Sequence, residues 1–345
     1  MNGDLKVLMI TPNWPSEARP STSHFIKRQA DFLRAAGVDV DVFHFKGQKR
    51  PLSYARAWLA VRRKLRETRY DLIHAQFGHS GLMALPRRLP LVVTLRGSDI
   101  LGIVSDRDGR YTRVGRLMQA ITRFVASRAD AVIMVSAHMA SELGETRQTH
   151  VIPSGLDFDL FKPIPKAEAR AALGLPPDER LVLFVGNPDQ KRKRFDLAER
   201  AMQRLNERLS ARLITAWGVP HSDIPKYMAA CDTLLFTSMQ EGSPNVVKEA
   251  LACDMPVVSV DIGDVADRIG GIEGCELCAD ETPEAISDAL ERALRGSGRV
   301  AGRVAVEHLC ERATTDRVIS VYRNVVAGQS SAAARGSNLA EATPV

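Results

Sequence analysis

The chain has 345 residues, of which 45% are hydrophobic and 26% are charged. This balance is typical of a globular protein and excludes a fibrous or disordered chain, and the length favours two domains over a single core. No apolar run approaches the roughly 20 residues that span a bilayer, and Pro12 interrupts the first apolar run too early for a signal peptide. We therefore expect a cytoplasmic protein.

The two halves of the chain differ in charge. Residues 1–155 contain 24 Lys and Arg against 13 Asp and Glu, whereas the remainder contains 23 against 28. A basic half indicates an anionic partner, such as phosphate groups or the acidic surface of a membrane; a solvated basic face without a partner is the alternative. No nucleic-acid-binding motif accompanies the charge, so nucleic acid is not an expected partner.

Strands and helices alternate along the sequence. A short apolar strand at 6–10 precedes a Pro- and Ser-rich loop and a helical pattern that ends at Gly37, and residues 38–43 alternate in polarity as a strand does. Further apolar runs occur at 72–73, 91–95 and 131–135, and a second series occurs at 180–186, 211–215, 233–236 and 256–260. Such alternation predicts parallel βαβ units.

Prolines between residues 163 and 177 separate the two series. We therefore predict an α/β protein with two Rossmann-like domains, residues 1–158 and 159–312, whose ligand-binding loops face an interdomain cleft. Residues 313–327 are assigned to a C-terminal helix that returns to the N-terminal domain. The small and polar residues 328–345 are assigned to a disordered tail.

All five cysteines lie in the second half of the chain. Cys275 and Cys278 have the spacing of a zinc or redox pair, but no second pair of ligands stands at a similar spacing. We therefore interpret the cysteines as small apolar side chains. No metal site is predicted from them.

The most informative stretch is 241–250, which follows a predicted strand and runs into a predicted helix. Pro244 suits the first turn of a helix, Gly242 lets the backbone approach a ligand, and the helix start offers N–H groups to a diphosphate. Glu241 and Glu249 are eight residues apart, and carboxylates accept hydrogen bonds from sugar hydroxyls at roughly 1.5–3 kcal/mol each. The alternative is a capped surface helix with two solvated glutamates.

This stretch resembles the E-x7-E signature of the retaining glycosyltransferases of family 4, which have the GT-B fold. The flanking residues 228–232 and 252–258 are similar to that family too, and the resemblance extends from the first strand to about residue 325. It implies that Glu241 contacts the transferred sugar and that Glu249 holds the ribose hydroxyls. The donor sugar and phosphates are then expected to be covered by Gly242, Ser243, Pro244, Asn245 and Val246.

A second similar segment follows the strand that ends near Gly186. The family commonly has an arginine just after this glycine and a lysine about six residues later, both on the donor diphosphate. Here Asn187 replaces the arginine and Lys193 takes the lysine position, with Arg192 as a substitute cation. A lysine beside a departing diphosphate offsets its growing charge; a solvated basic loop before a helix is the alternative.

The N-terminal half departs further from the family. Arg96 and Asp99 stand where relatives carry His-Gly-x-Asp, so Arg96 replaces a histidine implied to contact the donor sugar. The family's glycine-rich first loop is replaced by residues 20–24, in which Ser21 and Ser23 offer backbone N–H groups to a phosphate. His74 and His79 are candidates for the acceptor side, with core histidines as the alternative.

Residues 54–69 form an amphipathic helical pattern. Tyr54, Trp58, Val61 and Leu65 share one face among six Arg and Lys side chains. One interpretation is a helix that rests on an anionic membrane surface near a lipid-linked acceptor. The other is an ordinary helix that packs on the N-terminal sheet.

The resemblance implies retaining transfer of a hexose-type sugar from a UDP- or GDP-sugar to a saccharide or lipid-linked acceptor, as in polysaccharide or glycoconjugate biosynthesis. No Asp-x-Asp motif with a carboxylate cluster is present, so neither a cofactor nor an essential metal is expected. A non-catalytic nucleotide-sugar-binding regulator and a GT-B-fold epimerase or phosphorylase remain as alternatives. A dehydrogenase is disfavoured because the first strand is not followed by G-x-G-x-x-G.

Overall fold

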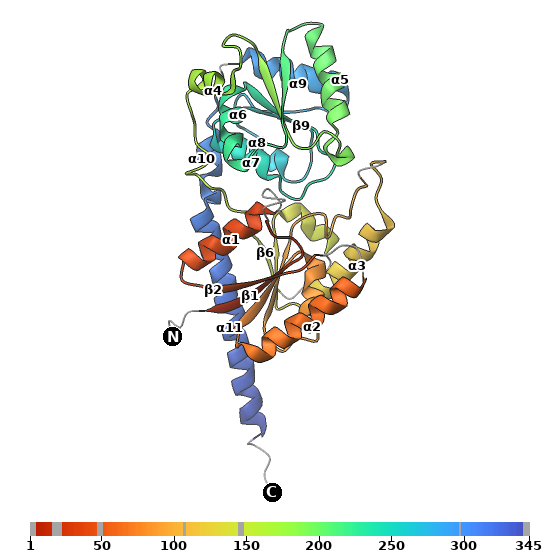
Figure 1. Cartoon of the computed structure of the whole chain (residues 1–345), viewed down its shortest axis with the longest axis vertical. Helices are drawn as coiled ribbons and strands as arrows, with labels where there is room; N and C mark the ends of the chain where they lie inside the picture. The colour runs from red at the N-terminus through yellow and green to blue at the C-terminus, as the bar shows by residue number, and fades with distance from the viewer. Residues whose placement is uncertain are drawn as a thin grey trace. The chain divides into compact units, whose positions relative to one another are not determined.

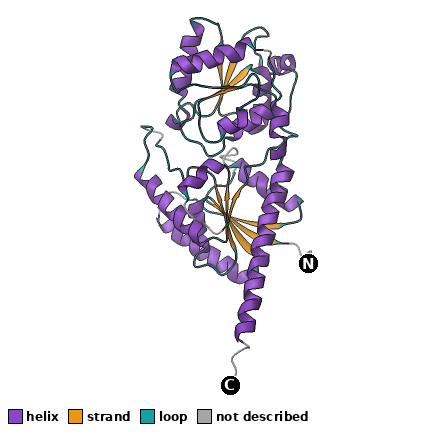
Figure 2. Cartoon of the chain, turned by 180° about the vertical axis from the view of Figure 1, so that it is seen from behind, coloured by secondary structure: helices purple, strands orange, loops and turns teal. Residues whose placement is uncertain are grey.

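A computed structural model describes residues 5–15, 23–46, 51–105, 108–143, 148–296 and 298–340. The chain divides into two compact units (Figures 1 and 2). The first unit contains residues 1–101, 116–153 and 312–345, and the second contains 102–115 and 154–311. Each unit is built on one parallel sheet, drawn in orange in Figure 2, with helices on both faces. Among the described residues, no helix is long and apolar enough to cross a bilayer.

The sheet of the first unit has six parallel strands in the order β2-β1-β3-β4-β5-β6. Their bounds are β1 (Lys6–Thr11), β2 (Asp39–His44), β3 (Leu72–Gln76), β4 (Leu91–Leu95), β5 (Ala131–Met134) and β6 (Thr149–Val151). Helices α1 (His24–Ala35), α2 (Pro51–Glu67), α3 (Arg113–Arg128) and α11 (Glu311–Ala340) and the 3-10 helices η1 (Gly78–Ala84) and η2 (Ala137–Glu142) accompany it. The central strands are continuously apolar because both faces of the sheet are covered.

Side chains of β1 show which helices cover which face. Leu8 and Ile10 point into a core that includes residues of α2, η1 and α3, whereas Val7 and Met9 point into a core with residues of α1 and α11. This division follows from the two-residue period of a strand. Helices α2 and α3 therefore belong to one layer, and α1 and α11 to the opposite layer.

Helix α11 is part of the first unit although it comes last in the sequence. Val318, Tyr322 and Val325 are buried in the same core as Met9. The helix continues to Ala340, beyond residue 327, after which the sequence predicts a disordered tail. Alanine is frequent in this segment and has the highest helix propensity.

The second unit includes residues 102–115, whereas the sequence predicts one continuous domain, 1–158. No local sequence signal marks the unit to which a loop belongs.

The sheet of the second unit has five parallel strands in the order β11-β10-β9-β7-β8. Their bounds are β7 (Leu181–Val185), β8 (Arg212–Ala216), β9 (Thr233–Phe236), β10 (Val257–Ser259) and β11 (Glu276–Leu277). One face is covered by α6 (Ile224–Ala230), α7 (Asn245–Ala252), α8 (Val265–Ile269) and α10 (Gly302–Val306). The other is covered by α5 (Phe195–Asn206) and α9 (Pro283–Arg295). The remaining helices are α4 (Lys166–Leu173), η3 (Lys191–Lys193), η4 (His221–Asp223) and η5 (Glu307–Leu309).

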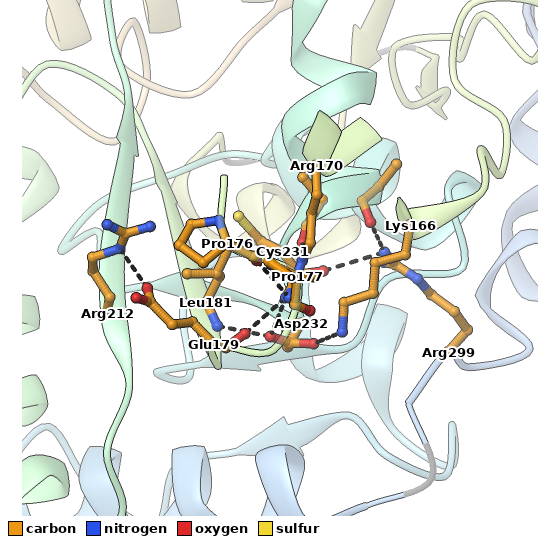
Figure 3. Close-up of polar contacts among 12 residues, drawn as sticks. Lys166, Arg170, Pro176, Pro177, Glu179, Leu181, Arg212, Cys231, Asp232 and Arg299 are labelled. Carbon is orange, nitrogen blue, oxygen red and sulfur yellow. Dashed lines mark hydrogen bonds and ion pairs between the residues drawn. The ribbon is translucent and has the colours of Figure 1, made fainter. Parts of the chain in front are cut away.

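Two arginines, Arg170 and Arg299, fix the amino edge of this second sheet (Figure 3). Arg170 of α4 is 3% exposed and donates to the carbonyl oxygen of Ala230 at 2.8 Å and to Asp232 at 3.1 Å. Asp232 also accepts the N–H of Leu181, the first residue of β7, at 2.7 Å. Arg299 donates to carbonyl groups at the end of α6, where a helix leaves its last carbonyls unpaired. This network holds the edge opposite to the one at which ligands bind parallel sheets.

Candidate functional site

The loops after β7 and β9 bring three charged side chains together at the carboxyl edge of the second sheet. Glu241, which follows β9, places Oε1 at 2.8 Å from Lys193 Nζ and at 2.5 Å from Arg192 Nη1. Because β7 and β9 are neighbours in the sheet, residues 48 and 49 positions apart in sequence meet at one carboxylate. The alternative of solvated charges is wrong here, since Glu241 and Lys193 are only 17% and 16% exposed.

The cluster carries more positive than negative charge. Burial alone would raise the pKa of the Glu241 carboxyl, but the charges of Lys193 and Arg192 outweigh burial and lower this pKa below its ordinary value. Glu241 is therefore ionised at neutral pH and offsets only one of the two cations. The ammonium of Lys193 also lies 5.4 Å from the centre of the Phe236 ring, in a cation–π arrangement. The arrangement favours an additional anion.

Backbone hydrogen bonds hold the two loops in register. Met239 N–H donates to the carbonyl of Arg192 at 2.9 Å, and the Thr237 hydroxyl donates to the carbonyl of Lys193 at 2.9 Å. Arg194, at a φ of 52°, turns back and donates from Nε to the carbonyl of Thr237 at 2.6 Å. The positions of Lys193 and Arg192 are thus set by the strand that precedes Glu241.

The loop between Glu241 and α7 presents unpaired donors. The N–H groups of Gly242 and Ser243 meet no acceptor within the described part of the chain, and no side chain caps α7. Pro244 lies just before the helix, Asn245 begins it and Val246 follows in its first turn. Free N–H groups at a helix start are the usual protein contribution to a phosphate site.

An aspartate and a glycine support this loop from behind. Asp264 is 4% exposed, and its Oδ2 accepts from the Ser243 hydroxyl at 2.9 Å and from Arg268 Nε at 3.0 Å. Gly263 has a φ of +66°, and a Cβ there would lie 3.0 Å from the carbonyl oxygen of Glu241. The loop that begins α8 therefore fixes the conformation of the loop that contains Glu241.

Glu249 lies inside α7 and is 4% exposed, so the alternative of a solvated surface glutamate is wrong for it as well. Its Oε1 is 3.1 Å from His221 Nε2, which places the proton of that bond on the imidazole when the carboxylate is ionised. The His221 ring packs edge-on against Phe161 at 5.2 Å. The neighbouring Lys248 is buried and donates to the carbonyl of Ser154 at 3.3 Å.

Asn187 does not join the cluster by a described contact. Its side-chain oxygen accepts the N–H of Asp189 at 3.0 Å and so closes the turn after β7. Gly186 before it has a φ of +146°, where the lack of a side chain matters. Arg192, the substitute cation named from the sequence, brings the second positive charge to Glu241; its role on the donor diphosphate stays a prediction.

In the first unit, Arg96 and Asp99 organise the loops after β3 and β4. Arg96 Nη2 donates to Gln76 Oε1 at 2.6 Å and to Gln29 Oε1 at 2.9 Å. Asp99 is 3% exposed and accepts the N–H groups of Gly78 at 2.8 Å and of Gly97 at 2.9 Å. Asp99 thus shapes the backbone, while the guanidinium of Arg96 is held in one orientation by two amides.

The prediction that His74 faces the acceptor is wrong. His74 has no exposed surface, its Nε2 lies 2.7 Å from the Thr94 hydroxyl and its Nδ1 lies 2.6 Å from the Tyr322 hydroxyl. Burial lowers the pKa of His74 to about 3, so the ring is neutral. His79, half-buried beside the rings of Tyr54 and Phe77, also has its pKa lowered by burial. The core-histidine alternative is correct for His74.

Ser23 immediately precedes α1 with a φ of 51°, and its carbonyl accepts the N–H of Ile26 at 2.9 Å. Residues 20–22 of the predicted phosphate loop, including Ser21, lie outside the described residues, and His24 begins α1. The cysteines behave as apolar side chains: burial raises the pKa of Cys275 to about 11 and that of Cys278 to about 12. Both are therefore protonated thiols at neutral pH.

Two family models match the chain. The model described as Glycosyltransferase Family 4 matches residues 4–160, and the model described as Glycosyl transferases group 1 matches residues 182–296. The chain belongs to glycosyltransferase family 4. The second match contains both loops that form the Glu241 cluster, so the cluster lies in the group 1 half of this family 4 glycosyltransferase.

Curated relatives agree with this assignment. The family 4 chain is 27% identical to a teichuronic acid biosynthesis glycosyltransferase of Bacillus subtilis, TuaC, over 84% of the chain and 89% of the relative. It is 29% identical to the D-inositol 3-phosphate glycosyltransferase of Mycobacterium tuberculosis over 74% of the chain, which spans 62% of that relative. The chain therefore has glycosyltransferase activity.

Solved structures confirm the predicted fold class. Sucrose-phosphate synthase from Thermosynechococcus elongatus superposes with a TM-score of 0.77 at 20% identity, over 94% of this chain and 100% of that one. Anabaena HepE, solved in complex with UDP and glucose, superposes with a TM-score of 0.66 at 19% identity, over 93% and 100%. The family 4 chain thus has two Rossmann-like α/β units of the GT-B type.

Sequence reasoning missed several residues of this site. His221 reaches Glu249 from the loop after β8, and Asp264 reaches Ser243 from the loop after β10. Tyr111, from the segment 102–115, accepts a hydrogen bond at 3.4 Å from the side chain of Gln240, which precedes Glu241. A signal existed for the first two, since polar residues directly after parallel strands gather at one sheet edge.

Proposed function

We propose that this glycosyltransferase transfers a hexose-type sugar, with retention of configuration, from a UDP- or GDP-sugar to a hydroxyl of a saccharide or lipid-linked acceptor. The observation that carries the proposal is the Glu241 cluster, in which one ionised carboxylate faces two cations beside unpaired N–H groups. A diphosphate offers the negative charge and the acceptor oxygens that such a site lacks.

The donor contacts follow from this geometry. Lys193 and Arg192 hold the diphosphate, and the N–H groups of Gly242 and Ser243 add hydrogen bonds to it. Glu249, oriented by His221, accepts hydrogen bonds from the ribose hydroxyls. UDP and glucose bound to HepE support a nucleotide-sugar donor of this kind.

In the transfer step, the bond between the anomeric carbon and the diphosphate oxygen breaks while a bond to the acceptor oxygen forms on the same face. The proton of the acceptor hydroxyl passes to a phosphate oxygen of the departing nucleoside diphosphate. Lys193 and Arg192 stabilise the charge that develops on the leaving group in a site partly shielded from water, which is a task that a metal ion performs in other enzymes. Because these two cations take over that task, no essential metal is proposed. Glu241 positions the sugar and forms no covalent bond.

A saccharide acceptor is favoured by the similarity to a teichuronic acid biosynthesis glycosyltransferase. We place this chain in polysaccharide or glycoconjugate biosynthesis on that ground. The excess of Lys and Arg over Asp and Glu in residues 1–155 suits an acceptor that carries phosphate or is attached to lipid. The protein then works in the cytoplasm or peripherally at a membrane.

The donor site is tested by titrating the purified protein with UDP, GDP and their common sugar conjugates. Lys193→Ala and Glu249→Ala are each expected to weaken binding of the preferred nucleotide at least tenfold, about 1.4 kcal/mol. Lys191→Ala is the matched control, because Lys191 is an exposed lysine of the same short helix. Absence of nucleotide binding by folded wild-type protein would refute the donor site.

Turnover separates the proposed function from its alternatives. Release of nucleoside diphosphate that depends on an added saccharide acceptor is expected, and it persists in the presence of a chelator. The anomeric configuration of the product, measured by NMR, should equal that of the donor. A protein that binds nucleotide-sugar without any turnover across acceptors would be a regulator instead.

A further inference from the structure

Helix α2 uses its predicted apolar stripe inside its own unit. Val61 is completely buried, and Tyr54 and Leu65 pack against the core beneath the helix. Trp58 donates from its indole nitrogen to the carbonyl of Leu85 at 2.7 Å. The stripe Tyr54–Trp58–Val61–Leu65 is therefore committed to the fold, and the interpretation that this stripe rests on a membrane is wrong.

The opposite, outer face of α2 is apolar in its own right. Leu52 is 71% exposed and Leu59 is 61% exposed. On α3, which covers the same face of the sheet, Leu117 is 58% exposed and Phe124 is 46% exposed. Apart from Trp58, five of the eleven large hydrophobic side chains that are exposed among the described residues lie on these two helices, a concentration that typically marks an interaction surface.

The same two helices are strongly basic. Helix α2 contains five Arg and Lys against one acidic residue, Glu67, and α3 contains four Arg and no acidic residue. Exposed arginines that form no ion pair with a described residue are Arg56 and Arg66 on α2 and Arg113, Arg116 and Arg128 on α3. Apolar and cationic side chains thus share one outer layer of the first unit.

Arg62 of α2 is half-buried, and part of its guanidinium has no partner among the described residues. The Nε and Nη2 atoms of Arg62 have no hydrogen-bond partner in the described residues, and its guanidinium lies 5.1 Å from the centre of the Trp58 ring. Burial, together with the charge of Arg88, lowers the pKa of Arg62. The like charges of Arg62 and Arg88 add to the positive potential of this layer, which attracts anionic phosphates.

We propose that the outer faces of α2 and α3 bind the surface of a membrane that contains anionic phospholipid. Four exposed apolar side chains enter the boundary between headgroups and acyl chains: Leu52, Leu59, Leu117 and Phe124. The arginines of the same two helices contact the lipid phosphates. Exposed apolar side chains ringed by arginine are the composition of interfacial helices, and each basic side chain near an anionic leaflet adds to binding. The membrane surface deepens the proposed function, because it brings the enzyme to a lipid-linked acceptor. Membrane binding does not depend on the donor site.

Co-sedimentation with vesicles tests the surface. Full-length protein is mixed with vesicles of phosphatidylcholine alone or of phosphatidylcholine with phosphatidylglycerol. We expect retention on the anionic vesicles only, and a decrease in retention as salt is raised, because salt screens the attraction. Equal retention on both vesicles, or none on either, overturns the proposal.

Substitutions locate the contact. The double variants Leu59→Asp/Phe124→Asp and Arg56→Glu/Arg116→Glu are each expected to reduce the partition coefficient at least tenfold. Arg323→Glu is the matched charge control, since Arg323 is exposed on α11 in the opposite layer, and Val304→Asp, at a side chain 74% exposed in the second unit, is the apolar control. Retention of both double variants at the wild-type level would overturn the assignment.

Two further measurements keep the outcomes distinct. UDP titration of the same variants is expected to match wild type, so that a failed donor site appears in the titration alone and a failed membrane surface in the vesicle assay alone. Sedimentation velocity tests the other occupant, a second copy of the chain. A wild-type dimer that the double variants dissociate, together with absent vesicle binding, would assign the surface to self-association and overturn the proposal.

Discussion

Replacing Glu241 by glutamine is expected to have opposite effects on nucleotide binding and on turnover. The Glu241 carboxylate lies 2.8 Å from Lys193 Nζ and 2.5 Å from Arg192 Nη1, the two cations that we assign to the diphosphate. The nucleotide must therefore share these cations with a negative charge. Glu241→Gln removes that charge and keeps the size of the side chain.

The magnitude follows from Coulomb's law. A phosphate oxygen that shares the Lys193 ammonium with Glu241 would lie about 5 Å from the carboxylate, where two like unit charges repel by about 3 kcal/mol at an effective dielectric constant of about 20. Loss of the ion pairs that hold Lys193 and Arg192 in place offsets part of this gain. We expect UDP to bind more tightly by about 1–2 kcal/mol, or roughly 5–30-fold.

Isothermal titration calorimetry with UDP measures this change directly, and turnover of the preferred UDP- or GDP-sugar is expected to fall at least a hundredfold because the sugar loses its positioning contact. Glu281→Gln is the control, since Glu281 pairs with the adjacent Arg194 and is 54% exposed. Unchanged or weaker UDP binding by Glu241→Gln would show that Glu241 serves only to position the cations, and the competition argument would be refuted.

Three further outcomes follow from buried groups. Asp264→Ala leaves the partly buried Arg268 without its partner. We therefore expect the free energy of unfolding, measured in urea, to fall by about 2–4 kcal/mol and the KM for the donor to rise. Unchanged values for both would show that Asp264 does not support the loop that contains Glu241. Arg170→Ala should destabilise the second unit by about 3–5 kcal/mol while Arg212→Ala, which breaks an exposed ion pair, costs under about 1 kcal/mol; equal effects would refute the role of the buried network. Since burial lowers the pKa of His74 to about 3 in the folded chain against about 6.5 when unfolded, the unfolded state binds the proton first, and stability falls as pH decreases from about 6.5 towards 3. Between pH 7 and pH 5 this amounts to about 2 kcal/mol, and His74→Gln should remove that part of the pH dependence of urea unfolding.

The sequence predicts the fold well because the fold depends on local signals, and it names Lys193 and Glu241 as site candidates, although their roles on a donor stay a prediction. Apolar runs separated by helical patterns define parallel strands, and the loops after two neighbouring strands carry Lys193 and Glu241 to one edge. The sequence does not reveal that Glu249 meets His221 or that Ser243 meets Asp264. These contacts depend on the order of strands in the sheet, which sequence alone leaves open.

The errors in the first unit have a similar cause. Periodicity shows that Tyr54, Val61 and Leu65 share a face of α2, but it does not show that this face is the buried one and that Leu59 on the outer face is exposed. His74 lies in a strand that reads as one of many apolar segments. Its burial is set by Tyr322 from the last helix, a contact between residues 248 positions apart.

The position of α11 determines the order in which the chain can fold during synthesis. Residues 154–311 of the second unit are consecutive, so most of that unit can complete its core while the C-terminus is still being translated. The first unit cannot, because the side of β1 that carries Val7 and Met9 is closed by Val318 and Tyr322. Until those residues leave the ribosome, an apolar sheet face made at the start of translation stays open to water and to chaperones. A fragment that ends near residue 153 would keep that face exposed permanently, so the N-terminal half is expected to aggregate when it is expressed alone.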